Sequence, residues 1–186
     1  LQSPLFSYIT DIGYQLFGFN VITSRLPSII FSSFSILVIY LITQEVFGDS
    51  KTALLASFLF AVSRYAILNN LEPDITAFFF TLLSIFFFIK FMKGNKRYIY
   101  LSAITLSLAI LSKVIAFLVI PAYVIFYFVY VYLYSNEIIL IRKKEGRIIV
   151  DKKVLLSFVY CILLVLLVVS PVIIHNYLTY KETGIT

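Results

Sequence analysis

Two acidic and three basic side chains are candidates for chemistry because they lie where long apolar stretches begin, end or are interrupted. Glu72 and Asp74 are two residues apart, and Arg25, Arg64 and Lys113 are separated from them by apolar stretches. A positioned carboxylate can activate an acceptor hydroxyl or amine as a general base. A cation placed in advance stabilises the negative charge that develops on a leaving group. These residue types therefore predict acid–base and anion-stabilising chemistry if the fold brings them together.

Each of the five also has a purely structural interpretation. Asp74 follows a proline and precedes an apolar run, so it could be the N-cap of a helix. Glu72 could be a solvated loop charge, and Lys113 could extend from a helix end towards the interface. Arg25 could anchor a helix at that interface, whereas Arg64 lies inside an apolar stretch and could pair with Glu72 or Asp74, because an intramembrane charge usually has a partner. Both interpretations stay open for all five.

The remaining chemistry-bearing residues argue against a metal centre. His175 is the single histidine and Cys161 the single cysteine, so this chain cannot form a site with several His or Cys ligands. We expect Cys161 to behave as a small buried hydrophobic residue. We predict no metal ligands and no certain cofactor, and we leave a divalent cation open, although no residue pattern supports one.

The elements that must position these residues are membrane spans. Hydrophobic residues make up 61% of the chain and charged residues 13%, whereas soluble domains have roughly 45–50% and about 25%. Crossing the hydrocarbon core takes about 20 apolar residues. We therefore predict an all-α, polytopic transmembrane helix bundle with about six spans, forming a single domain over residues 1–186. The predicted spans are Leu26–Phe47, Thr52–Asn70, Ile75–Met92, the shorter Tyr98–Ser112, Val114–Tyr134 and Val154–His175.

The distribution of Lys and Arg predicts the orientation of this bundle. Eleven of the 15 lie in or beside the breaks at 48–51, 93–97 and 135–153, and loops rich in Lys and Arg face the cytoplasm. We therefore predict a cytoplasmic basic loop at 135–153, and we place the segments 1–25, 70–74, 112–113 and 176–186 outside. The tyrosines from 123 to 134 are expected to form an aromatic belt near the cytoplasmic interface. The net charge of +6 does not indicate nucleic acid, because these cations lie at helix ends instead of sharing one solvated face.

The 25 N-terminal residues have the pattern of an interfacial helix. Apolar residues recur at helical spacing from Leu5 to Phe19, with polar residues such as Thr10, Asp11 and Gln15 between them. Such an amphipathic stretch lies along a membrane surface. We predict an extracellular juxtamembrane helix, although a loop that merely packs on the bundle would show a similar stripe.

Five short motifs follow one another along the chain: SPLFSYITDIGYQLFG (Ser3–Gly18), SRLPSII (Ser24–Ile30), LEPDITAFFF (Leu71–Phe80), LAILSK (Leu108–Lys113) and SPVIIHNYLTYKETG (Ser170–Gly184). In this order they resemble the motifs of the C-type membrane glycosyltransferases, and most closely the branch with dolichyl-phosphate-mannose protein mannosyltransferases and lipid A aminoarabinose transferases. The resemblance implies a catalytic acidic residue in a first extracellular loop, which we expect upstream of Leu1. It adds Asn176 to Glu72, Asp74, Lys113, Arg64 and Arg25 as substrate-binding candidates.

The resemblance also implies a function. Enzymes of this kind transfer a sugar from a polyprenyl-phosphate carrier to a protein, lipid or glycan acceptor outside the cytoplasmic membrane. We therefore expect a multi-pass enzyme of a prokaryotic plasma membrane, with membrane lipids and the carrier as partners and no nucleic acid. The alternative is a transporter or a non-catalytic membrane scaffold, but a transporter favours helices broken by Gly or Pro near mid-membrane and internal repeats. Here glycine is nearly absent from the spans and no repeat is visible.

Overall fold

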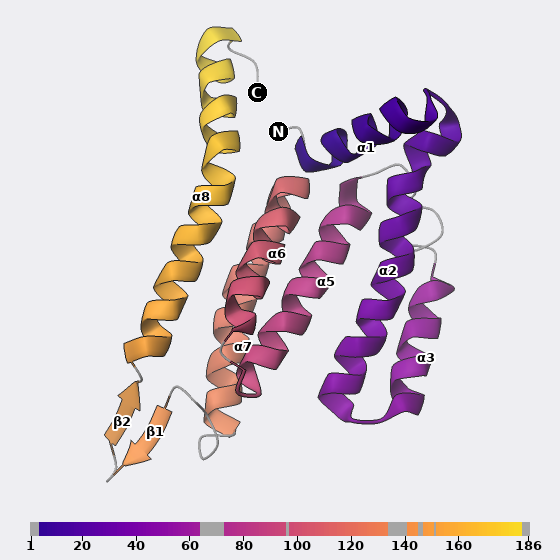
Figure 1. Cartoon of the computed structure of the whole chain (residues 1–186). Coiled ribbons are helices and arrows are strands. Elements are labelled where there is room, and N and C mark those ends of the chain that lie inside the picture. Colours follow the sequence, from indigo (N-terminus) through magenta and orange to yellow (C-terminus); the bar gives the residue numbers. More distant parts are fainter. Residues whose placement is uncertain are drawn as a thin grey trace.

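The computed structural model in Figure 1 describes residues 4–63, 73–95, 97–133, 141–144, 147–150 and 152–183. Within these residues the chain forms seven α-helices, one 3-10 helix and one two-stranded antiparallel sheet. The elements are α1 (Pro4–Phe17), α2 (Val21–Phe47), α3 (Ser50–Ala61), α5 (Pro73–Met92), α6 (Tyr98–Ser112), η1 (Val114–Leu118), α7 (Val119–Leu133), β1 (Ile141–Lys144), β2 (Arg147–Val150) and α8 (Lys152–Thr183).

The long helices lie side by side, and the connections between them collect at two ends of the bundle (Figure 1). Helix α1 lies across one end, which we call the α1 end, and the junction between α6 and η1 is at the same end. The α2–α3 turn, the α5–α6 turn and the β1–β2 hairpin lie at the opposite end, which we call the hairpin end. The breaks rich in Lys and Arg thus share one end, as the sequence predicted. The side of the membrane that each end faces stays a prediction.

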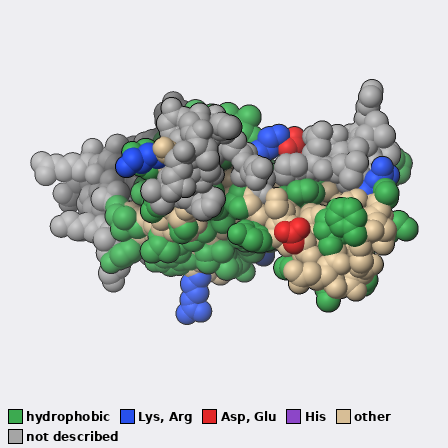
Figure 2. Space-filling view, turned by 90° about the horizontal axis from the view of Figure 1, so that it is seen from above, with side chains coloured by type: hydrophobic (Ala, Val, Ile, Leu, Met, Phe, Trp, Pro, Cys, Tyr) green, Lys and Arg blue, Asp and Glu red, His purple; other side chains and the backbone are tan. Residues whose placement is uncertain are grey.

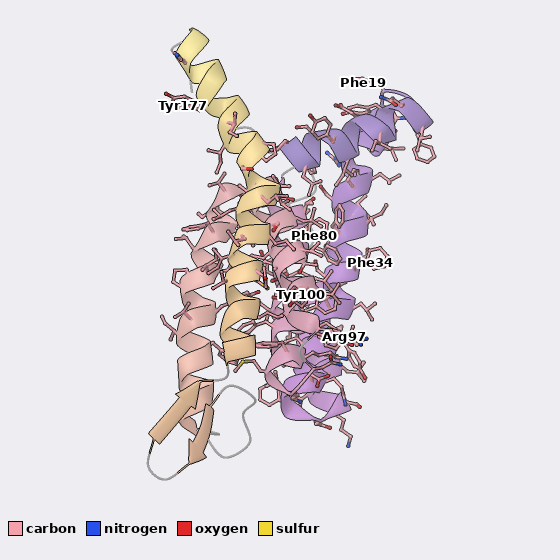
Figure 3. All side chains as sticks on the ribbon, turned by 60° about the vertical axis from the view of Figure 1, so that its left-hand side comes forward. Phe19, Phe34, Phe80, Arg97, Tyr100 and Tyr177 are labelled. Carbon is pink, nitrogen blue, oxygen red and sulfur yellow. The ribbon has the colours of Figure 1, made fainter. Side chains whose placement is uncertain are left out.

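Helices α2 and α5 pack in parallel with a constant offset of 48 residues. Near the α1 end, the Phe31 and Phe79 ring centroids are 5.2 Å apart. At the hairpin end, Lys93 Nζ lies 3.2 Å from Glu45 Oε1. Each pair is 48 residues apart in the sequence, so the two helices keep one register along their whole shared length. Figure 3 shows Phe34 of α2 and Phe80 of α5 in the same region of the bundle.

Three glycines with positive φ help the chain to change direction between helices. Gly18, Gly48 and Gly94 have φ values of 78°, 71° and 117°, a region that costs other residues strain. Gly48 ends α2 by donating its N–H to Gln44 O. Asp49 then caps α3, because its carboxylate accepts hydrogen bonds from the backbone N–H groups of Lys51 and Thr52.

Helix α6 packs on α5 through small side chains. Six of the nine residues that it buries are Ser, Thr or Ala: Ser102, Ala103, Thr105, Ser107, Ala109 and Ser112. Several of these hydroxyls donate to carbonyls of their own helix, as Ser107 does to Ala103 O at 2.8 Å. Small residues let helix backbones approach closely in a membrane. In one core cluster, Ala103 and Ile99 of α6 lie with Phe88, Phe91 and Met92 of α5 and Cys161 of α8.

The helix bounds correct several predicted spans. Within the described residues, two helices are long and apolar enough to cross a membrane, Val21–Phe47 and Asp74–Met92. The predicted span Thr52–Asn70 is not one described helix, since α3 ends at Ala61 and the Ser63 N–H closes a tight turn onto Phe60 O. Twelve residues cover only about 18 Å. In contrast, α8 runs to Thr183, beyond the predicted end at His175, because no helix-breaking residue follows its apolar stretch.

The predicted basic loop at 135–153 contains a β-hairpin that the all-α expectation did not include. Ile141 pairs with Val150 and Lys144 with Arg147. The β-branched residues in this segment, Ile141, Ile148, Ile149 and Val150, suit a strand. Charge counting alone could not reveal them as a strand pair. Residues 135–140, 145–146 and 151 of the loop lie outside the described residues, and 152–153 begin α8.

The N-terminal segment is a helix, as its spacing predicted. Helix α1 contacts α2 and α6, yet it buries no residue, and Tyr8, Ile12 and Leu16 are largely exposed. Phe19, at the corner between α1 and α2 (Figure 3), is also exposed and contacts the Tyr14 ring. This exposed apolar surface fits an interfacial helix, while its membrane contact and its side remain predictions.

Candidate functional site

The structure brings Asp74 and Lys113 into direct contact at the α1 end. Lys113 Nζ donates a hydrogen bond to Asp74 Oδ1, and the two side chains form an ion pair. They are 39 residues apart in the sequence and come from the first turn of α5 and from the α6–η1 junction. The fold thus brings these two of the five candidate residues together. Their roles stay predictions.

The ion pair is partly open to its surroundings. The Asp74 side chain is 25% exposed and the Lys113 side chain 40% exposed, so an anion could reach the ammonium group without unfolding the bundle. Seen from above, the described surface is mostly hydrophobic and few Asp, Glu, Lys or Arg side chains interrupt it (Figure 2). A charged pair in such surroundings is a plain candidate for binding a ligand that has both a charged and an apolar part.

Local sequence explains where each partner stands. Proline is favoured in the first helical position, where its missing N–H is not needed, and α5 begins at Pro73. Asp74 is consequently inside the first turn, and the expectation that it is the N-cap is wrong. A carboxylate there still interacts favourably with the helix dipole.

Lys113 stands at a chain reversal that contains no glycine or proline. Its backbone is extended, with φ −155° and ψ 123°. Its N–H donates to Ala109 O at the end of α6, and its carbonyl accepts from Ala116 N–H in η1. The same residue therefore ends one helix and begins the next, and the predicted turn at 112–113 is confirmed.

Of the other predicted site residues, only Arg25 has a described side chain, and it forms no ion pair or hydrogen bond with Asp74 or Lys113. Arg25 is exposed, lies in the second turn of α2 instead of before the span, and forms no ion pair with the part of the chain that the structure describes. By the 48-residue offset it stands level with the beginning of α5. Glu72 and Arg64 lie outside the described residues, and Asn176 is within α8 without a described side chain.

A polar cluster in the middle of the bundle was missed by sequence reasoning. The Tyr123 hydroxyl donates to Ser84 Oγ at 2.7 Å, and Ser84 Oγ donates to Ser102 O at 2.8 Å. Ser102 Oγ in turn donates to Ser84 O at 3.0 Å. Tyr123 is thus tied to α5 and does not belong to an aromatic belt at the helix end, so that expectation is wrong for this residue. The available signal was the single serine of α5, Ser84, and the three serines of α6, but the sequence does not reveal which of them face each other.

An apolar groove runs beside this cluster between α6, α7 and α8. Its volume is about 520 Å³. It begins near Phe117, one helical turn after Lys113, and Tyr123 forms part of its wall. The lining residues are Phe88, Ile99, Ser102, Ala103, Leu106, Phe117, Ile120, Tyr123, Val124, Cys161, Ile162, Val165 and Leu166. A groove of this composition suits a hydrocarbon chain, and most ligand pockets are likewise apolar with a few polar groups.

No group of three or more His, Cys, Asp or Glu side chains that could hold a metal occurs among the described residues. The site therefore offers one carboxylate and one ammonium group at the α1 end, followed by an apolar groove.

Comparison with known proteins agrees with these features. The family described as dolichyl-phosphate-mannose-protein mannosyltransferase matches residues 2–175. An uncharacterized protein of Aquifex aeolicus (strain VF5) is 29% identical over 130 residues, which is 68% of this chain and 26% of that protein. The chain thus spans about a quarter of the length of this relative. No solved structure matches this chain. Because the family match covers nearly the whole chain, the chain belongs to the dolichyl-phosphate-mannose-protein mannosyltransferase family.

Proposed function

We propose that the complete protein transfers a sugar from a polyprenyl-phosphate carrier to an acceptor on the outer face of the membrane. The observation that carries this proposal is the contact between Asp74 and Lys113, together with an apolar groove whose wall includes Phe117, four residues after Lys113. Family membership supports the reaction class. The Lys and Arg distribution supports the outer face, because the ion pair lies at the end opposite the basic breaks.

In this proposal Lys113 binds the phosphate of the carrier. As the bond between sugar and phosphate breaks, the phosphate gains negative charge, and an ammonium group already in place stabilises it. Asp74 binds that ammonium group before the carrier binds, so the Lys113 side chain does not need to be ordered during the reaction. The groove that begins at Phe117 takes the first isoprene units.

The test compares Lys113→Ala, Lys113→Arg and Lys93→Ala in the complete protein, reconstituted with a polyprenyl-phosphate sugar. Lys93 is the matched control because it also pairs with a carboxylate, Glu45, but at the hairpin end. Loss of a hydrogen bond to a charged group costs roughly 1.5–3 kcal/mol, so Lys113→Ala should reduce transfer more than about tenfold. Lys113→Arg should keep part of the activity, and Lys93→Ala should keep nearly all of it. Parental transfer by Lys113→Ala at normal expression would reject the proposed site.

A further inference from the structure

Tyr123 and Lys113 both form hydrogen bonds to α5 at the same sequence separation. The Tyr123 hydroxyl bonds to Ser84 on α5, just as Lys113 bonds to Asp74 on α5. Both pairs are separated by 39 residues. Consequently η1 and α7 run parallel to α5 in one register, and that register is held by a polar contact at each of two levels ten residues apart.

The three residues that follow Tyr123 on α7 are largely exposed and do not fix α7 to α5. Val124, Ile125 and Phe126 are 50%, 64% and 48% exposed, and the groove separates this part of α7 from α8. Tyr123 itself is half-buried, and its ring stacks on Phe88 with centroids 4.5 Å apart. Among the side chains that the structure describes, Tyr123 therefore joins α7 to α5 through both a hydrogen bond and a ring contact.

The acceptor of the Tyr123 hydrogen bond is itself fixed. Ser84 is completely buried and exchanges hydrogen bonds with Ser102 of α6 in both directions. The Ser84–Ser102 contact locks α5 to α6, which leads to Lys113 from one side. Tyr123 locks α7 to the same point, and α7 leads back to Lys113 through η1. Both chain segments that meet at Lys113 are thus tied to one buried serine.

We propose that Tyr123 is a positioning residue that holds Lys113 beside Asp74 by fixing the register of η1 and α7 on α5. This inference rests on the proposed function only where it concerns catalysis, since there Lys113 must wait in place for the carrier phosphate. The reaction chemistry does not involve Tyr123, which acts through the position of Lys113.

The first experiment measures position without activity. Cysteines replace Asp74 and Lys113 in a Cys161→Ala background of the complete protein lacking other cysteines, and a short bifunctional thiol reagent cross-links them. Tyr123→Phe keeps the ring and the groove wall but removes the hydroxyl. We expect it to slow cross-linking at least about threefold, and Ser84→Ala should do the same, because a neutral hydrogen bond contributes a few-fold to an equilibrium. Ser107→Ala is the matched control, since its buried hydroxyl bonds only within α6.

The second experiment measures transfer. Tyr123→Phe should lower kcat/KM for the polyprenyl-phosphate donor roughly fivefold, because the displaced Lys113 stabilises the developing phosphate charge less well. In a Lys113→Ala background the same substitution should have no further effect, whereas a general loss of stability would add to that of Lys113→Ala. Unchanged cross-linking in Tyr123→Phe, or effects of Tyr123→Phe and Lys113→Ala that multiply, would overturn the inference. If Lys113→Ala alone left transfer intact, the proposed function would fail, but the cross-linking result would still decide the role of Tyr123.

Discussion

The strength of the contact between Asp74 and Lys113 can be measured by a double-mutant cycle with Asp74→Asn and Lys113→Met. Two unit charges 4 Å apart attract by about 4 kcal/mol at an effective dielectric constant of about 20. Both side chains remain partly exposed, 25% for Asp74 and 40% for Lys113, and exposed ion pairs contribute only about 0.2–1 kcal/mol. We therefore expect a coupling free energy near the upper end of that range, about 1 kcal/mol.

The assay is unfolding of the complete protein in mixed detergent micelles, followed for the parent, both single variants and the double variant. The two single variants should together lose more stability than the double variant, and the difference should shrink in about 1 M salt because the Debye length is then about 3 Å. The Glu45–Lys93 pair provides a comparison, since its exposures of 28% and 47% are similar. A coupling free energy of zero for Asp74 and Lys113, with a measurable one for Glu45 and Lys93, would refute the reasoning.

Three other predictions follow from single features. A cysteine placed at Asp11 should be labelled from outside the cell and one at Glu145 should not; the reverse pattern would contradict the orientation. Gly13→Val should loosen α1 from α2 and lower the unfolding temperature, because even a Cβ at Gly13 would lie 3.3 Å from Thr23 Cγ2; an unchanged temperature would show that α1 moves freely. Hydrogen bonds from Thr52 and Lys51 lower the pKa of Asp49 from 3.8, so its carboxylate stabilises the fold above that pH and the stabilisation is lost as the pH falls through the lowered pKa. The stability difference between the parent and Asp49→Asn should therefore be present at pH 7 and vanish at strongly acidic pH, and a pH-independent difference would contradict this role.

The parts of the fold that could be predicted from the sequence depend on long apolar runs and on charge. The helix Tyr98–Ser112 has the predicted bounds, and the reversal at Lys113 follows from the length of the apolar stretch around it. The shared end of the basic breaks follows from the Lys and Arg count. Helix ends that depend on local hydrogen bonds were harder to predict from the sequence. The end of α3 at Ala61 depends on a turn closed by Ser63 onto Phe60 O, which hydrophobicity does not reveal.

The candidate site was predictable in its residues but not in its contacts. The sequence identified Asp74 and Lys113 as charged residues at apolar boundaries, and their meeting required both to lie at the same end of the bundle. It could not identify Tyr123, because a tyrosine in an apolar stretch has the same composition whether it lies in an aromatic belt or bonds to a buried serine. The register between α5 and α7, which decides this, is a property of packing between helices.

The small buried face of α6 has a consequence for how this helix tolerates sequence change. In lipid, helices gain little from hiding apolar surface, so close contact supplies much of their association. Exchanges among Ala, Ser and Cys at Ala103, Ser107 or Ala109 keep the α6 backbone near its neighbours. Leu at the same positions adds volume that a close-packed interface accommodates only with strain. Side-chain size, more than polarity, therefore limits the substitutions that this face accepts, and cysteine probes can be introduced there with little disturbance.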